Sequence, residues 1–214
     1  MPKTVHIYGA ARNVREAPLP SKGVEVWLSN SPTTTLIRCP RAINYWTRWF
    51  NLHSVKHMKG AYPAGYSYYG TKAEGRPVYF LKVQPDVPTS IAFPREKIQA
   101  AFATKKGPNR YFTCSVAWLI AFAILEGFER IELWGFELRD SKLYYKLERP
   151  CVFYWIKQAR DRGIEVTYQA AIEKIPFEPG DPDDHKGPLY GYSTKPEPDW
   201  DLETESWKTE DKSK

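Results

Sequence analysis

YFTCSVAWLIAFAILEGFERIELWGF, residues 111–136, decides the fold class of this chain. Residues 116–125 form an uninterrupted apolar run, which predicts a helix that is buried on all sides. Thr113 or Ser115 can cap the start of this helix, and Gly127 can end it in a left-handed conformation. Residues 131–134 then predict a central strand. A buried helix that leads into a buried strand is typical of a parallel sheet covered on both faces.

Segments on either side continue this alternation. Residues 42–53 carry apolar side chains at helical spacing, which predicts one face of an amphipathic helix or a pair of turns. Between the first two strands the prolines allow a short helix at most. The remaining strands are expected at 4–8, 24–28, 77–83 and 164–168, and the remaining helices at 93–102 and from Arg149 or Pro150 to about Arg162, closed by Gly163. These elements predict a single Rossmann-like α/β domain, with a mostly parallel sheet and helices on both faces.

Charge divides the chain at Phe177. Residues 1–177 hold 26 basic and 14 acidic residues, whereas residues 178–214 hold 5 and 11. The net charge of +12 on the first part favours an anionic partner, although a solubility charge explains it equally well. We therefore expect a domain at 1–177 and an acidic, proline-rich tail at 178–214 that is largely mobile. Within this tail, residues 189–192 (LYGY) could dock on the domain.

The composition excludes several classes of protein. With 42% hydrophobic and 15% aromatic residues, the chain is neither disordered throughout nor fibrous. Its longest apolar run is about half the length needed to cross a bilayer, and no secretory leader is recognisable, so we expect a cytoplasmic protein without a membrane span. The three widely spaced cysteines indicate neither a disulfide framework nor a structural zinc site.

Polar residues follow several of the expected strands. In an open parallel sheet, ligands bind at the carboxyl ends of the strands, where loops and helix starts present backbone N–H groups. Gly9 allows close backbone approach, Arg12 suits a phosphate group, and hydroxyl groups at a helix start add donors. The candidate nucleotide-binding residues from this reasoning are Gly9, Arg12, Asn13, Asn30, Thr113, Cys114, Ser115, Gly135 and Arg149. A role in a turn or a helix cap explains each of these residues taken singly. The combination of the residues favours a phosphate site. The chain has neither a dinucleotide fingerprint nor a P-loop.

Catalytic candidates are fewer. His53 could act as a general base, and His53 with His57 has the spacing of two metal ligands on a helix, although no HExxH motif surrounds them. Glu137 and Asp140 could act as a base or hold Mg²⁺, and a solvated loop explains them equally well. Cys114 at a helix start has either a lowered pKa or the role of a small packed residue, which we favour. We take His53 and Glu137 as catalytic candidates and predict no resident metal site.

Several segments together resemble a known family. In order along the chain they are HIYGAARN, VEVWLSN, TRWFNLH, YFTCSVAWLIAFAILEGFERIELWGFEL, ERPCVFYWIKQARDRGIEV and LYGY. They are similar to small phage-encoded Rossmann-like proteins of the MptE-like (6-hydroxymethylpterin diphosphokinase-like) group, over residues 4–192. A more distant similarity to bacterial sialyltransferases that use CMP-activated sugars implies nucleotide contacts by Tyr144 and Tyr145. The resemblance implies a phage protein in the host cytoplasm that binds a nucleotide or nucleotide-sugar, with Mg²⁺ accompanying the donor.

Three functions remain open at this point. The first is a transferase that uses a nucleotide-activated donor and is glycosyltransferase-like or diphosphokinase-like. The second is a non-catalytic protein that binds or sequesters a nucleotide, as in counter-defence. The third is a basic nucleic-acid-binding protein, because exposed aromatic and basic side chains suit single strands. The many Trp and Tyr residues could equally build an oligomer interface.

Overall fold

A computed structural model describes most of the chain. The described residues are 2–29, 32–61, 63–105, 107, 109, 111–136, 143–169, 200–201 and 206–207. The expected domain boundary at Phe177 and the docking segment at 189–192 lie outside these ranges and stay predictions.

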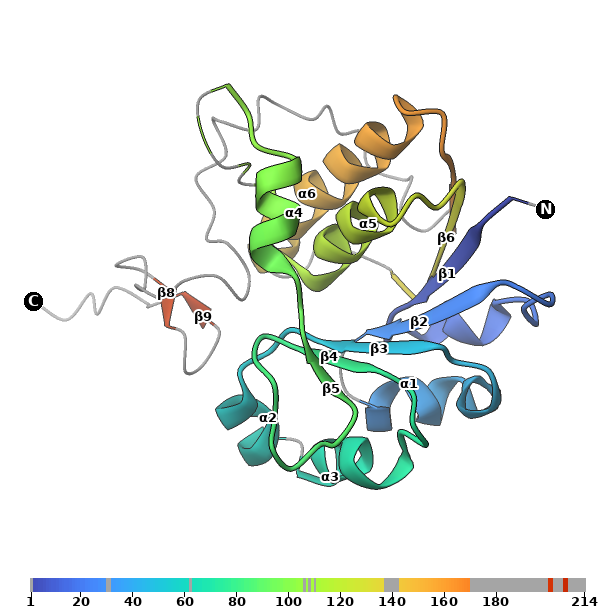
Figure 1. Cartoon of the computed structure of the whole chain (residues 1–214), viewed down its shortest axis with the longest axis vertical. Coiled ribbons are helices and arrows are strands. Elements are labelled where there is room, and N and C mark those ends of the chain that lie inside the picture. The colour runs from blue at the N-terminus through green and yellow to red at the C-terminus, as the bar shows by residue number, and fades with distance from the viewer. Residues whose placement is uncertain are drawn as a thin grey trace, which may run out of the picture.

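Seven parallel strands form one sheet in the order β5-β4-β3-β2-β1-β6-β7 (Figure 1). The strands are β1 (Thr4–Tyr8), β2 (Glu25–Ser29), β3 (Arg48–Asn51), β4 (Val78–Phe80), β5 (Ser90–Ala92), β6 (Arg130–Trp134) and β7 (Glu165–Tyr168). From β1 the chain adds strands in one direction as far as β5, and then returns to pair β6 with the free side of β1. The direction of winding therefore reverses between β1 and β6, and the expected parallel α/β architecture is confirmed.

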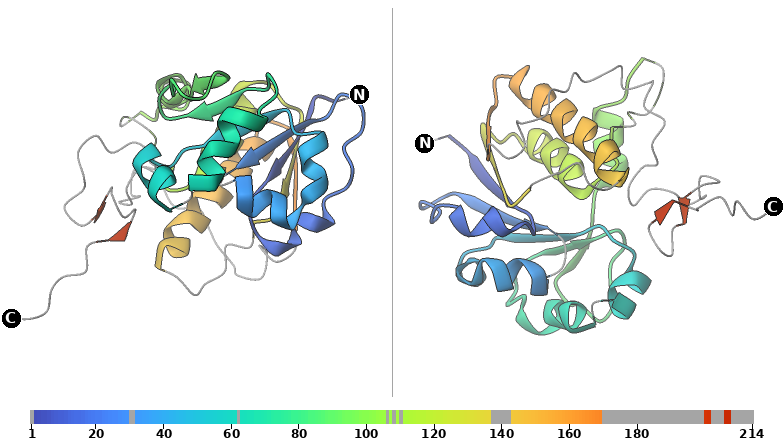
Figure 2. Two further views of the ribbon diagram at one scale, coloured as in Figure 1. Left: turned by 90° about the horizontal axis from the view of Figure 1, so that it is seen from below. Right: turned by 180° about the vertical axis from the view of Figure 1, so that it is seen from behind.

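Helices cover both faces of the sheet (Figures 1 and 2). On one face lie α4 (Arg95–Ala101), α5 (Ser115–Leu125) and α6 (Leu143–Arg160), and on the other lie α1 (Pro32–Arg38), α2 (Val55–Ala61) and α3 (Pro63–Lys72). Two short 3-10 helices, η1 (Arg12–Glu16) and η2 (Pro40–Asn44), join the second group. A separate antiparallel pair consists of β8 (Trp200–Asp201) and β9 (Ser206–Trp207).

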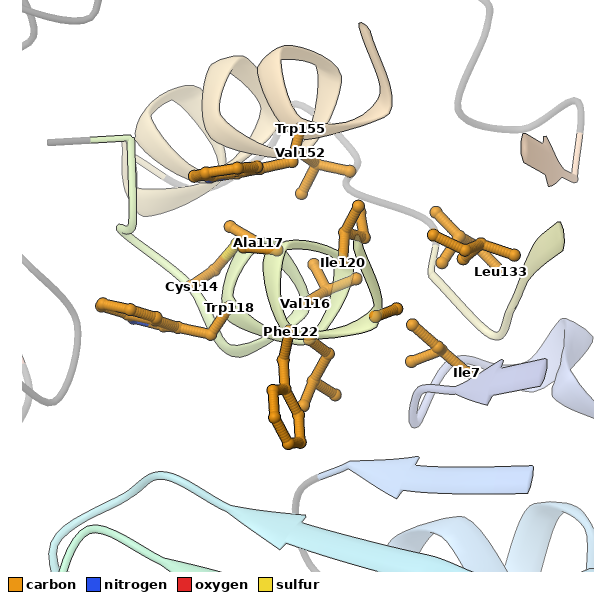
Figure 3. Close-up of a cluster of buried hydrophobic side chains, with 14 of the residues drawn as sticks. Ile7, Cys114, Val116, Ala117, Trp118, Ile120, Phe122, Leu133, Val152 and Trp155 are labelled. Carbon is orange, nitrogen blue, oxygen red and sulfur yellow. The ribbon is translucent and has the colours of Figure 1, made fainter. Parts of the chain in front are cut away.

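The buried helix expected at 116–125 is α5, and it organises the larger of the two cores (Figure 3). Every residue of α5 from Ser115 to Ala123 is buried, because α6 covers the side that faces away from the sheet. Trp118 stacks on Phe112 with ring centroids 3.6 Å apart, and Phe122 packs against Trp27 of β2. Gly127 ends the helix with φ at +73°, as its sequence position predicts.

The helix or pair of turns expected at 42–53 is wrong for its second half. Residues 40–44 form η2, but β3 runs from Arg48 to Asn51 inside the sheet. Phe50 points into the core around α5 and Trp49 into the core around α1 to α3. A strand that is buried on both faces is apolar without alternation, so its pattern is indistinguishable from one face of a helix.

The start expected for the last helix is also wrong. α6 begins at Leu143, so Pro150 lies within the helix and does not open it. The side of α6 that faces α5 buries Cys151, Val152 and Trp155. This packing keeps the helix continuous at Pro150, where the local preference of proline would interrupt it. The sequence reasoning also missed α1, α2, α3 and β5.

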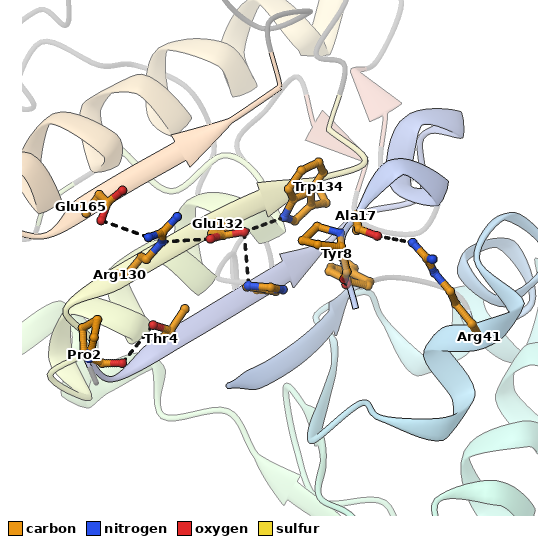
Figure 4. A network of polar contacts seen from close by, with 11 residues as sticks. Pro2, Thr4, Tyr8, Ala17, Arg41, Arg130, Glu132, Trp134 and Glu165 are labelled. Atoms are coloured by element: carbon orange, nitrogen blue, oxygen red, sulfur yellow. Dashed lines mark hydrogen bonds and ion pairs between the residues drawn. The ribbon is translucent and has the colours of Figure 1, made fainter. Parts of the chain in front are cut away.

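A chain of polar contacts crosses β1, β6 and β7 on the face of α1 to α3 (Figure 4). His6 Nε2 lies 3.2 Å from Glu132 Oε2, and the Arg130 guanidinium joins Glu132 (2.9 Å) to Glu165 (3.4 Å). Trp134 Nε1 donates to the same Glu132 carboxylate. The register pairs His6 with Glu132 directly, so this contact is set by strand alignment.

The buried His6 is expected to make the free energy of unfolding decrease at acidic pH. Burial lowers the pKa of His6, and this effect outweighs the raising effect of Glu132, while Arg130 lowers the pKa further. The unfolded chain therefore binds a proton more readily than the folded chain, and stability falls as the pH drops below the ordinary histidine value. We expect His6→Gln to flatten the free energy of unfolding between about pH 7 and pH 5, measured by urea titration. Equal slopes for His6→Gln and the wild type would refute the assignment.

Candidate functional site

The loops that follow β1, β6 and β7 are joined at the carboxyl edge of the sheet. The N–H of Gly9 donates to the Trp134 carbonyl (2.7 Å), and that of Ala11 donates to the Gly135 carbonyl (2.8 Å). Gln169, directly after β7, accepts a hydrogen bond from the Gly135 N–H through Oε1 (3.1 Å). These contacts build one connected surface over the position where the sheet changes its direction of winding.

Gly9 and Gly135 lie so close together that neither position has room for a side chain. A Cβ at Gly9 would lie 2.5 Å from the Gly135 carbonyl oxygen and 2.6 Å from the Phe136 ring. Gly135 has φ at +77°, and its Cβ would lie 2.7 Å from the Cβ of Val14. Gly9 does permit the close backbone approach expected of it, but the segment that approaches belongs to β6 and its loop. A ligand would therefore sit over this contact and not between the two loops.

Arg12 and Asn13 begin η1 above this contact. The Arg12 side chain is exposed, whereas the side-chain oxygen of Asn13 is buried and has no hydrogen-bond partner within the described part of the chain. The Asn13 carbonyl accepts from Gln169 Nε2 (3.0 Å), which also donates to the Glu16 carboxylate. We call Gly9, Arg12, Asn13, Gly135 and Gln169 the switch cluster. It offers the exposed Arg12 guanidinium and, among the described residues, a buried acceptor without a hydrogen-bond partner at the same edge.

The exits of β2 and β3 carry polar side chains that hold the loops in place. Ser29 Oγ donates to the Tyr8 carbonyl (3.0 Å), and Asn51 Oδ1 accepts from the His53 backbone N–H (3.1 Å). His53 is half-buried directly after β3. Because β3 is two strands from β1, adjacent-strand spacing places its exit about 10 Å from the switch cluster.

A second group gathers where α6 covers the start of α5. Thr113, Cys114 and Ser115 are all buried there. Thr113 Oγ1 donates to Cys151 Sγ (2.9 Å), and Cys114 Sγ donates to the Glu148 carbonyl (3.9 Å). We call Thr113, Cys114, Ser115, Glu148 and Arg149 the helix-start cluster. Its hydroxyl and thiol groups connect the two helices.

Cys114 is a packed thiol. It occupies the N-cap position of α5 in an extended conformation, and its side chain makes no capping hydrogen bond. Burial is the largest effect on its pKa and raises it well above the ordinary value, and the charges of Glu148 and Cys151 raise it further. The N–H groups of the first helical turn act in the opposite direction with less effect. This supports the packing role and removes the thiolate that a nucleophile requires.

Glu148 is the ionisable residue that sequence reasoning missed. Burial raises the pKa of its carboxyl group to about 8, so the group exchanges a proton near neutral pH. Its neighbour Arg149, a predicted nucleotide-binding residue, is only 7% exposed. Because the helix was expected to start at Arg149 or Pro150, Glu148 was assigned neither to an element nor to a site. No local signal extends the helix back through Glu148, because the buried apolar side chains described for α6 begin only at Cys151.

Several predicted site residues are not placed. Asn30, Glu137 and Asp140 lie outside the described residues. Tyr144 and Tyr145 belong to the first turn of α6, of which the structure describes only the backbone. Among the residues that are described, no group of three or more His, Cys, Asp or Glu side chains could hold a metal ion.

An open pocket of about 420 Å³ lies between α2, α3 and the loop after β4. Lys59 Nζ lies 3.0 Å from the Asp86 carboxylate, and the Tyr66 hydroxyl donates to it (2.7 Å). The hydrogen bond from Tyr66 and the contact with Lys59 lower the pKa of Asp86. The polar groups of this pocket thus satisfy one another, and the switch cluster is the stronger candidate for an anionic ligand.

Comparisons of the chain with protein-family models, with curated proteins and with solved structures found no match. In the ranges that the structure describes, no helix has the length and apolar character needed to traverse a bilayer.

Proposed function

We propose that this protein binds a nucleotide, or the nucleotide part of an activated donor, at the switch cluster. The observation that carries the proposal is a pair of groups at the ends of β1 and β6: the exposed Arg12 guanidinium and the buried Asn13 side-chain oxygen, which has no hydrogen-bond partner among the described residues. Guanidinium groups pair with phosphate, and a buried acceptor suits a ribose hydroxyl or a base amino group. Open parallel sheets bind ligands where their winding reverses.

Charge supports the same proposal. Residues 1–177 carry a net +12, which raises the local concentration of an anionic nucleotide around the domain. The Gly9–Gly135 contact closes the base of the site, so the ligand rests on the loop surface beside η1. This arrangement differs from a glycine-rich loop that wraps a pyrophosphate.

Transfer of a group from the bound donor is the activity that we assign to this site. Glu148 lies in the helix-start cluster, and its pKa of about 8 makes it a candidate for a proton transfer in such a reaction. His53 and Glu137 stay the candidates from the sequence, with Arg149 as a source of positive charge. If His53→Ala and Glu137→Ala both retain full turnover of an identified donor, the assignment of these two residues is wrong.

Arg12→Ala tests the binding site. A charge-assisted hydrogen bond contributes about 1.5–3 kcal/mol, so we expect its loss to weaken the Kd for a nucleoside diphosphate about tenfold or more. Isothermal titration of CDP, ADP, GDP and UDP, with and without Mg²⁺, measures this change. Lys22→Ala is the matched control, because Lys22 is an exposed cation in the turn before β2, at the opposite edge of the sheet.

The outcomes separate the site from the overall charge. Equal losses in Arg12→Ala and Lys22→Ala would show that net charge alone attracts the nucleotide, and the switch cluster would be wrong. A nucleotide that binds and is then consumed, followed by chromatography, supports the transferase. Binding without consumption assigns a sequestering role.

A further inference from the structure

An arginine-rich surface with two exposed apolar side chains lies beside the switch cluster. We call it the arginine face and define it by its six residues: Arg12, Arg15, Leu19, Ile37, Arg38 and Arg41. Leu19 is 66% exposed and Ile37 is 77% exposed, and both belong to the few large apolar side chains that are exposed among the described residues. Apolar side chains among cations suit a partner that offers both acidic and apolar groups.

The elements that carry these residues are in contact. η1 and α1 lie side by side below the sheet in Figure 1, and the left view of Figure 2 agrees. The Arg41 guanidinium donates to the carbonyls of Arg15 and Ala17 (Figure 4). The Tyr8 hydroxyl donates to the Pro18 carbonyl. These contacts fix the segment that bears Leu19 against the start of η2, and α1, which carries Ile37 and Arg38, contacts both η1 and η2.

The arginine face carries little compensating negative charge. Residues 9–23 and 32–44 contain Glu16 as their only acidic residue. The Glu16 carboxylate accepts a hydrogen bond from Gln169, which turns it towards β7. Within these two ranges the positive charge of the four arginines is therefore opposed by one carboxylate, and an acidic segment is the complementary partner.

We propose that residues 178–192 of this chain, EPGDPDDHKGPLYGY, occupy the arginine face. Four acidic residues and one lysine precede three apolar side chains, Leu189, Tyr190 and Tyr192. The carboxylates pair with the arginines, and the apolar side chains cover Leu19 and Ile37. A nucleic acid would pair with the arginines but leave the two apolar side chains without a partner. Arg12 also belongs to the switch cluster, so the segment and a nucleotide would compete for it, whereas Arg15, Arg38 and Arg41 lie outside that cluster.

The tether makes the contact reachable. The chain leaves the sheet at Gln169, which is itself hydrogen bonded to Asn13 and Glu16 of η1. Eight residues separate Gln169 from Glu178 and can span about 30 Å when extended, which exceeds the length of η1 and α1 together. A segment held this close has an effective concentration of about a millimolar, so even a weak contact is populated.

Hydrogen exchange of the full-length protein tests the contact directly. The test variant changes Asp181, Asp183 and Asp184 to Asn, and the control changes Glu210 and Asp211 to Gln and Asn. We expect backbone amides in residues 12–20 and 35–41 to exchange about tenfold faster in the test variant and at the wild-type rate in the control. Unchanged exchange in the test variant would overturn the proposal.

A peptide of residues 178–192, added to the full-length test variant, identifies the partner. Fluorescence anisotropy should show binding to the test variant and about tenfold weaker binding to the wild type, where the attached segment competes. Leu19→Ser with Ile37→Ser should abolish peptide binding. The proposal fails if the peptide does not bind, or if a single-stranded oligonucleotide binds instead and is insensitive to the two serine substitutions.

Discussion

Gly135→Ala is expected to destabilise the protein by about 2–5 kcal/mol. The left-handed backbone at Gly135, with φ at +77°, costs a side chain about 1–2 kcal/mol, and forcing a methyl group into packed atoms costs about 1–3 kcal/mol more. The methyl group would meet the Cβ of Val14 at 2.7 Å and the Gly9 backbone near 3 Å. Neither neighbour can move aside by a side-chain rotation, because one is the Cβ atom of Val14 and the other is backbone.

Gly127→Ala is the matched control for this experiment. Gly127 has nearly the same φ, +73°, but a Cβ there would meet nothing within 4 Å. Its substitution should cost only the backbone part, about 1–2 kcal/mol. Urea unfolding at fixed pH gives both free energies. Equal losses at the two positions would show that the loops separate easily, and the close contact between the β1 and β6 exits would not be a determinant of the fold.

Glu148→Gln is expected to stabilise the protein at alkaline pH. The folded pKa of about 8 exceeds the ordinary value of 4.5, so the folded chain holds a proton that the unfolded chain has lost between these two values. Wild-type stability therefore falls as the pH rises through this window. The glutamine mimics the neutral acid and avoids the loss. At about 1.4 kcal/mol per pH unit, the gain grows from nothing near pH 4 to a ceiling of about 5 kcal/mol above pH 8.

The same variant separates stability from activity. Urea titrations at pH 5, 7 and 9 should show the gain increasing with pH, whereas Glu96→Gln, at an exposed carboxylate of α4, should show none. A constant difference at all three values would mean that the Glu148 carboxyl group is solvated. If Glu148 also moves a proton during transfer, we expect Glu148→Gln to be less active as well as more stable. Such a result would mean that the buried carboxyl group serves activity at a cost in stability.

The sequence was sufficient for the class of fold but not for the order of its strands. Local patterns located β1, β2, β4, β6, β7 and α5, because these elements combine an apolar run with a clear end signal such as Gly127. The segment of β3 was expected to be one face of a helix or a pair of turns, because Trp49 and Phe50 are buried on opposite faces and leave no alternating pattern. The pairing of β1 with β6 depends on contacts between segments that are distant in the sequence, and no local pattern encodes it.

The candidate site was predicted in part. Gly9 and Gly135 were expected at strand ends, and the structure places both there, but their mutual contact follows from strand order. Glu148 could not be found because the position of its helix start decides whether its carboxyl group is buried or solvated. Gln169, which ties three loops together, belongs to no motif.

The central position of β1 has a consequence for synthesis on the ribosome. The strand is made first, yet its partner β6 begins at Arg130, so one hydrogen-bonding edge of β1 stays open until most of the domain has been translated. Until then, β1 to β5 can assemble into a partial sheet. In this partial sheet β1 is an exposed edge strand, although it lies inside the finished sheet. Such an edge invites pairing with other nascent chains, so the yield of native protein should depend on how quickly translation proceeds from β5 to β6.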